Sequence, residues 1–130
     1  MVGKIKARMW CYDYPKIMTH VSATEALDSL EEQSSDAVEV FDKESMTVEL
    51  ARHTAGQAAP KNPHTEDELY HIISGSGKIR VGDRVHSVEA GDTVFVKQGL
   101  EHDFFDIDEE LVTLIVFAGS QDPASYSIRE

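Results

Sequence analysis

Two stretches decide how this chain folds: GQAAPKNPHTEDELYHIISG at residues 56–75 and GDTVFVKQGLEHDFFD at residues 91–106. Each contains a glycine-bounded loop that delivers a histidine to the mouth of a strand, His64 in the first and His102 in the second. Glu68 follows His64 by four residues, at the start of the first strand. If the two strands lie side by side, these three side chains surround one point. Two imidazoles and a carboxylate on one face bind Fe(II), Mn(II) and related ions and leave positions open for water, oxygen or a substrate oxygen.

The sequence around these stretches alternates with a period of two and is rich in β-forming residues. Gly82-Asp83 is a two-residue hairpin signal, and further turn signals recur about every 8–12 residues. This pattern predicts an all-β sandwich or barrel. The chain has no room for helical crossovers between parallel strands. The expected strands are residues 37–41, 45–53, 69–74, 78–81, 84–88, 93–96, 102–107 and 111–118.

One helix is predicted ahead of the strands, at residues 23–32. Ser22 and Glu25 have the spacing of a capping box, and the apolar residues of the segment fall on one helical face. Residues 1–21 are expected to be extended and irregular, with one strand near residues 5–11.

The two histidine-bearing stretches resemble the two motifs of the cupin family. In the first motif, Gly56, His64, Glu68 and Gly75 match without gaps, and Asn62 stands where the family has its first histidine. The second motif is matched by Gly91, Gly99 and His102, whereas Lys97 replaces a proline and Asp106 replaces an asparagine. Fifteen residues, 76–90, separate the motifs, a spacing similar to that of small bacterial and archaeal cupins.

This resemblance implies an all-β fold, a double-stranded β-helix or jelly-roll barrel with one short N-terminal helix. The corresponding division of the chain is an N-terminal extension at residues 1–36, a barrel at residues 37–119 and a tail at residues 120–130. The extension is expected to pack on the barrel or on a partner.

The resemblance also implies a metal in the mouth of the barrel, held by His64, Glu68 and His102. Asn62 removes one imidazole from the usual set; it can ligate through its amide oxygen, hydrogen-bond a metal-bound water, or do neither. The expected cofactor is one divalent transition metal, with Fe, Mn, Zn and Ni left open.

Two further residues are candidates for acid–base work beside the metal. Glu66 flanks the predicted ligand Glu68, although a solvated loop is the favoured interpretation of it. Tyr70 shares the parity of Glu68, so that it and Ile72 should line the barrel interior. The same interior is expected to take four phenylalanines, Phe95, Phe104, Phe105 and Phe117.

The remaining four histidines are interpreted as ordinary polar or packed side chains. His71 has the opposite parity to Glu68 and should face away from it. His86 should face solvent, His53 can point either way from the end of its strand, and His20 has no ligand partner nearby in the sequence.

Composition excludes several classes of partner. The 130 residues include 12 Lys and Arg against 24 Asp and Glu, a formal net charge of −12. Such a chain repels phosphates, so neither nucleic acid nor an anionic membrane is expected as a partner. With 41% hydrophobic residues the chain is not a disordered acidic segment, and its length predicts a single domain.

The location expected for the protein is the cytoplasm. Its single cysteine, Cys11, forms no intrachain disulfide. The basic residues near the N-terminus are not followed by an apolar signal region, and the longest apolar run, residues 111–118, is too short to span a membrane as a helix.

Three functions are compatible with these residues. The first is a metal-dependent enzyme, a dioxygenase, isomerase or decarboxylase, acting on a small organic acid or carbonyl compound. The second is a non-catalytic module that binds or senses a small ligand. The third, a metal-free relative of sugar-nucleotide isomerases, has only Arg52 and His53 to support it. Whether the protein is an enzyme stays open. Apolar residues near the N-terminus, Met9, Trp10, Tyr12 and Tyr14, predict a homodimer.

Overall fold

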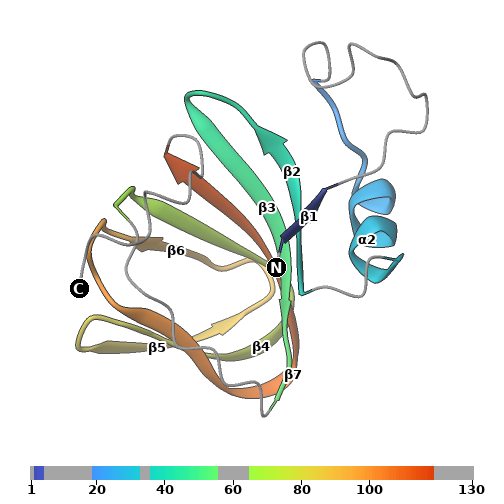
Figure 1. The fold of residues 1–130 in the computed structure, drawn as a ribbon. Coiled ribbons are helices and arrows are strands. Elements are labelled where there is room, and N and C mark those ends of the chain that lie inside the picture. Colours follow the sequence, from blue (N-terminus) through green and yellow to red (C-terminus); the bar gives the residue numbers. More distant parts are fainter. Residues whose placement is uncertain (1, 5–18, 33–35, 56–64, 119–130) are drawn as a thin grey trace.

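The computed structural model describes residues 2–4, 19–32, 36–55 and 65–118. One short helix and a single curled sheet make up this part of the chain (Figure 1). The elements, in chain order, are β1 (Val2–Lys4), α2 (Ala23–Glu32), β2 (Ala37–Asp42), β3 (Met46–His53), β4 (Glu68–Val81), β5 (Arg84–Glu89), β6 (Thr93–Val96) and β7 (His102–Ala118). The strand predicted near residues 5–11 and the C-terminal tail lie outside the described residues.

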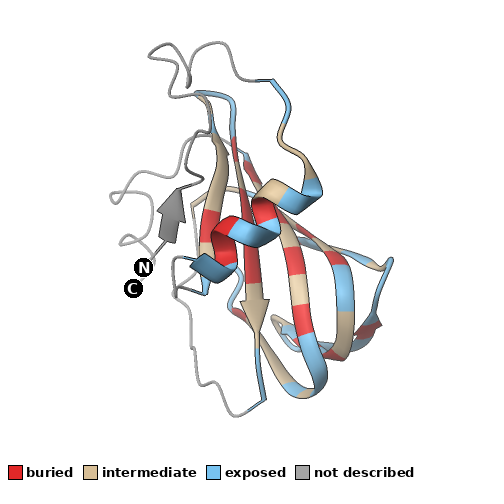
Figure 2. Cartoon of the chain, turned by 90° about the vertical axis from the view of Figure 1, so that its right-hand side faces the viewer, coloured by how far each residue is buried: buried red, intermediate tan, exposed pale blue. Residues whose placement is uncertain are grey.

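Helix α2 begins and ends where the sequence predicts. Its capping box is formed: the Ser22 hydroxyl accepts a hydrogen bond from the Glu25 amide (3.1 Å), and a Glu25 carboxylate oxygen accepts one from the Ser22 amide (3.4 Å). The apolar face of the helix packs on β2 and β3, with Leu30 against Val38 and Leu50. A fully buried leucine contributes about 1.5–3 kcal/mol, so this face holds the helix on the outside of the sheet (Figure 2).

The sheet has the strand order β1-β2-β3-β7-β4-β5, and β6 pairs with β4. Strand β7 pairs with β4 along both of its halves: His102 lies opposite Val81 at one end, and Phe117 lies opposite Glu68 at the other. The pairing therefore brings the first residue of β4 and the first residue of β7 into the same curled sheet.

Two predicted breaks in the strands are absent. Residues 69–74 and 78–81 belong to the single strand β4, and residues 102–107 and 111–118 to the single strand β7. Gly75, which lies between the two strands predicted at residues 69–74 and 78–81, has φ +91° and lies among three register shifts in the β4–β7 pairing. It therefore bends the strand without ending it, as a glycine in a β-bulge does.

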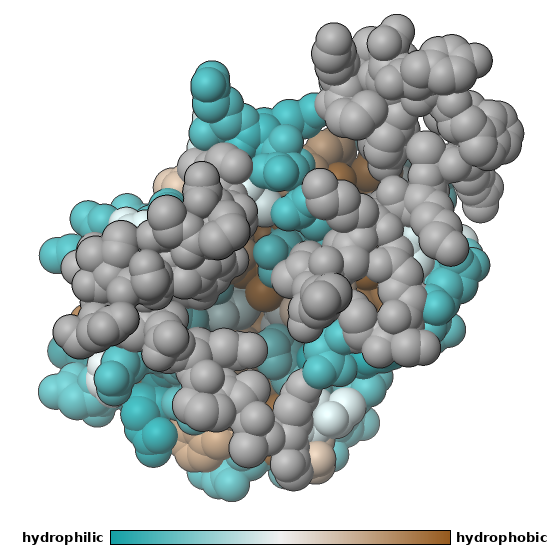
Figure 3. All heavy atoms as spheres, in the orientation of Figure 1, coloured by the Kyte–Doolittle hydropathy of each residue, from teal (hydrophilic) through white to brown (hydrophobic). Residues whose placement is uncertain are grey.

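The core has two layers. The inner layer fills the curled sheet with large apolar side chains from β4, β6 and β7, and Tyr70 and Ile72 belong to it as predicted. The outer layer lies between α2 and the strands β2 and β3. On the face seen in Figure 3, hydrophilic residues dominate the visible margin of the described part, and hydrophobic residues show deeper, near the centre.

Two of the four phenylalanines predicted to line the interior do not. Phe95 is 58% exposed, because its inward-facing neighbour on β6 is Val96. Phe105 lies opposite Lys78, on the outer face, where the Arg80 guanidinium sits 4.8 Å from the centre of its ring. Phe104 and Phe117 pack in or against the inner core as expected.

No helix in the described part of the chain is long and apolar enough to cross a membrane.

Candidate metal centre

Glu68 is the first residue of β4, and its carboxylate points into the curled sheet. It lies opposite Val96 of β6 and Phe117 of β7, and it is only 2% exposed. Burial of a carboxylate is costly unless a proton, a cation or hydrogen bonds compensate for it. Because its cross-strand neighbours Val96 and Phe117 are apolar, the compensating group must come from elsewhere in the site.

His102, the first residue of β7, lies next to the Glu68 carboxylate. It is 4% exposed, and its Nδ1 lies 3.1 Å from the backbone oxygen of Leu100. Because a carbonyl oxygen can only accept, Nδ1 carries the hydrogen and donates it. In the neutral ring, Nε2 then keeps its lone pair, the tautomer that a metal ligand requires.

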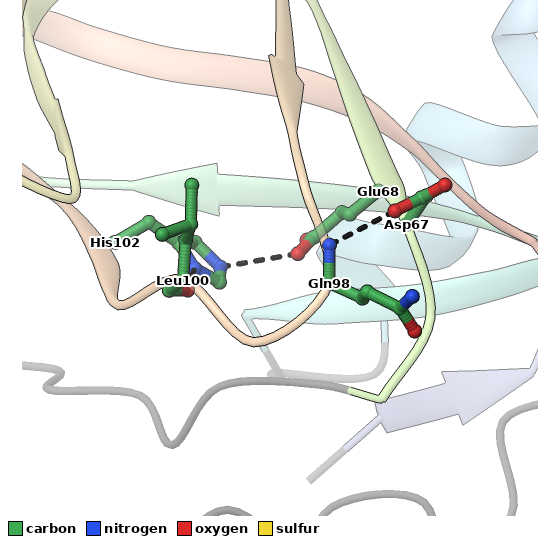
Figure 4. A network of polar contacts seen from close by, with 5 residues as sticks. All are labelled: Asp67, Glu68, Gln98, Leu100 and His102. Atoms are coloured by element: carbon green, nitrogen blue, oxygen red, sulfur yellow. Dashed lines mark hydrogen bonds and ion pairs between the residues drawn. The ribbon is translucent and has the colours of Figure 1, made fainter.

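Nε2 of His102 and Oε1 of Glu68 lie 3.1 Å apart (Figure 4). The two atoms are not aligned as a hydrogen bond, and Glu68 Oε1 accepts no hydrogen bond from any described residue. An imidazole nitrogen and a carboxylate oxygen that face one buried point are a donor set that suits Fe, Mn, Zn and Ni. The described residues therefore fit a divalent cation at this point.

The remaining predicted ligands, His64 and Asn62, lie outside the described residues. Within the described ranges, no cluster of three or more His, Cys, Asp or Glu side chains suits a metal ion. The structure thus brings Glu68 and His102 together, and the complete ligand set stays a prediction.

Tyr70 stands beside this pair, two residues along β4. Its ring contacts His102 (5.9 Å between centroids) and Phe104 (5.0 Å), edge to face in both cases. Burial, followed by the charge of Glu68, a hydrogen bond to that carboxylate and the charge of Glu49, raises the pKa of Tyr70 well above 10.0. The hydroxyl therefore stays protonated at neutral pH and can act as a hydrogen-bond donor.

Glu66, the other predicted acid–base residue, lies in the bend that precedes β4. It is half-buried, and its carboxylate accepts a hydrogen bond from the Thr65 hydroxyl (2.8 Å). No contact in the structure tests the role assigned to it, which stays a prediction.

Sequence reasoning missed a second buried carboxylate, Glu49. It is 6% exposed and lies on the face of β3 that also carries buried Thr47 and Ala51. The alternation of polar and apolar residues in β3 is visible in the sequence. However, the apolar face carries Leu50 against α2, and this leaves the polar face for the barrel interior.

The other described histidines divide as their strands dictate. His53 points inward, with its ring 4.5 Å from that of Phe104 and its Nε2 3.4 Å from the Thr113 hydroxyl. His71 lies on the outer face, 3.0 Å from the Thr93 hydroxyl. His86 and His20 are exposed, as predicted for His86.

Comparison with known proteins agrees with this architecture. The family model described as "Cupin domain" matches residues 49–117, more than half of the chain, so this protein belongs to the cupin family. The uncharacterized protein SCO3923 of Streptomyces coelicolor is 38% identical over 74 residues, which cover 57% of this chain and 70% of that protein.

Two solved structures illustrate the range of the likeness. An RmlC-like cupin with a double-stranded β-helix fold from Methanocaldococcus jannaschii has a TM-score of 0.59 at 17% identity, covering 68% of this chain and 85% of that one. A variant of oxalate decarboxylase from Bacillus subtilis has a TM-score of 0.62 at 27% identity over 68% of this chain. The match spans only 26% of the decarboxylase chain.

Proposed function

We propose that this protein is a metal-binding cupin that binds, and acts on, a small organic acid or carbonyl compound in the mouth of its barrel. The observation that carries the proposal is the buried pair of Glu68 and His102, whose Oε1 and Nε2 atoms face one point. The resemblance to oxalate decarboxylase, an enzyme named for a small acid, supports this substrate class.

In this proposal His64 completes a set of two imidazoles and one carboxylate. Asn62 adds an amide oxygen, a hydrogen bond to a bound water, or neither. The cofactor is one divalent ion of Fe, Mn, Zn or Ni. When bound, such an ion polarises a substrate oxygen as a Lewis acid.

The chain's own residues complete the site. Tyr70, neutral and buried beside His102, donates its one hydroxyl hydrogen to the Glu68 carboxylate, and it acts on a substrate oxygen only by exchanging that partner. Phe104 packs edge to face against Tyr70 and helps to exclude water from the interior. Glu66 is the proposed second acid–base group, from the bend before β4.

Elemental analysis of protein purified without chelators tests the metal centre. We expect close to one transition-metal ion per chain in the wild type and almost none in His102→Ala, which loses the Nε2 ligand. His86→Ala is the matched control, because it removes an exposed imidazole from β5. It should keep the wild-type metal content.

A wild type that carries no metal, and takes up none of Fe(II), Mn(II), Zn(II) or Ni(II) on reconstitution, would contradict the proposal. The Glu68–His102 contact would then be a buried ion pair of protein groups alone. Binding of a small carbonyl compound without any product would instead assign a ligand-binding module.

A further inference from the structure

Asp67, the residue before Glu68, bonds to two segments of the chain near the proposed metal centre. One carboxylate oxygen of Asp67, Oδ1, accepts a hydrogen bond from the backbone amide of Gln98 at 2.9 Å. Its own backbone oxygen accepts another from the amide of Ala118 at 3.0 Å. Asp67 is thus tied to the end of β7 and, through its side chain, to the turn before His102 (Figure 4).

That turn sets the direction of the His102 ring. The Leu100 amide donates to the Lys97 oxygen (3.2 Å), and Gly99 has φ +84°, which makes the turn tight. The backbone oxygen of Leu100 then accepts the Nδ1 hydrogen of His102. A shift of the turn would therefore rotate or release the imidazole.

We infer that Asp67 is a positioning residue of the metal centre: its carboxylate fixes the turn that aims His102 at Glu68. The inference rests on the proposed metal-binding function. Asp67 is not itself one of the proposed metal ligands, because it is exposed and adjoins Glu68 only along the chain. A group that bonds a ligand directly, as the Leu100 oxygen bonds His102, typically changes metal affinity 10- to 100-fold, and Asp67 acts on that group through the turn.

If Asp67 served only the stability of the fold, its loss would lower the unfolding temperature and leave metal affinity unchanged. A positioning role predicts the reverse. The hydrogen bond is exposed to solvent, so water can satisfy the Gln98 amide when the carboxylate is removed. The unfolding temperature of the metal-free protein should then change little. Metal affinity should change more, because the two ligand atoms must stay within a few tenths of an ångström of their places.

Three variants test the inference with Zn(II) as the probe, titrated in competition with a coloured chelator. Asp67→Ala should weaken Zn(II) binding about tenfold. Asp67→Asn keeps an oxygen acceptor for the Gln98 amide and should bind Zn(II) nearly as tightly as the wild type. Asp108→Ala removes an exposed carboxylate elsewhere on β7 and should have no effect.

Equal losses in Asp67→Ala and Asp67→Asn would overturn the inference, since the negative charge and not the hydrogen bond would then matter. Unchanged Zn(II) affinity in Asp67→Ala would overturn it as well.

A second readout uses metal-free protein and separates this inference from the proposed function. In Asp67→Ala, the Gln98 amide should exchange its hydrogen faster, and the ring ¹⁵N shifts of His102 should show that the Nδ1–H tautomer is less populated. If the wild type binds no Zn(II), the proposed function fails while these measurements still test the positioning. Unchanged exchange and unchanged ring shifts would contradict it.

Discussion

Tyr70 is buried in the barrel interior, and its surroundings favour the neutral phenol. Burial is the largest cause of its raised pKa, and the carboxylates of Glu68 and Glu49 add to it. In an unfolded chain the same hydroxyl ionises near pH 10. The difference links the stability of the fold to pH.

Below about pH 10 the phenol is protonated in both states, and its pKa shift has no effect on the pH dependence of stability. Above that pH the unfolded chain loses the proton and the folded chain keeps it. We therefore expect the free energy of unfolding of metal-free protein to fall by up to about 1.4 kcal/mol per pH unit through this group. Tyr70→Phe should lack this component, as urea unfolding from pH 8 to pH 11 will show. Parallel curves for the two proteins would contradict the prediction.

At the scale of elements, β4 runs through a bend that only a glycine tolerates. Gly75 has φ +91°, and a Cβ built on it would lie 2.0 Å from the backbone oxygen of Glu110 on β7. Since the obstacle is backbone, no side chain can move aside to make room. The bend allows one strand to pair along its whole length with β7.

Gly75→Ala should therefore destabilise the protein by about 3 kcal/mol or more, which combines backbone strain with displacement of β7. Gly91→Ala is the matched control. Gly91 has a similar φ of +96°, but a Cβ there meets nothing within 4 Å. Its cost should be about 1–2 kcal/mol, from strain alone. Thermal unfolding of both variants measures the difference, and equal costs would show that the Glu110 contact is relieved without penalty.

At the scale of the whole molecule, α2 covers only part of the outer sheet face. Beyond it, the side chains Val48, Val116, Leu69 and Phe95 are successive cross-strand neighbours on β3, β7, β4 and β6. Phe95 is exposed and the other three side chains are half-buried. An uncharged row of this kind stands out on a chain whose net charge is −12, and apolar surface commonly marks an interface.

We therefore retain the prediction of a homodimer, made from the aromatic N-terminal segment. Light scattering at micromolar concentration should give twice the chain mass of 14.5 kDa. The mass should persist at high salt, because apolar burial does not depend on ionic attraction. A mass of one chain would refute the dimer.

Most of the fold follows from local patterns in the sequence. The capping box at Ser22 predicted the start of α2, and alternation together with turn residues located most strands. The two motifs pointed to Glu68 and His102 as neighbours, although 34 positions separate them along the chain. The prediction that Phe95 of β6 and Phe105 of β7 face the interior was wrong, since both aromatic side chains lie on the outside of the sheet.

What the sequence by itself determined is the helix, the position of most strands, the cupin family and the pairing of Glu68 with His102 as candidate ligands. Hydrophobic period, capping and turn chemistry act over a few residues, and the motif spacing is unusual enough to identify the family. Only the tertiary structure showed that β4 and β7 are continuous, that Glu49 faces inward and that Asp67 accepts a hydrogen bond from the Gln98 amide. These features depend on which distant strands pair and in which register, and that choice is made by the packing of the whole sheet.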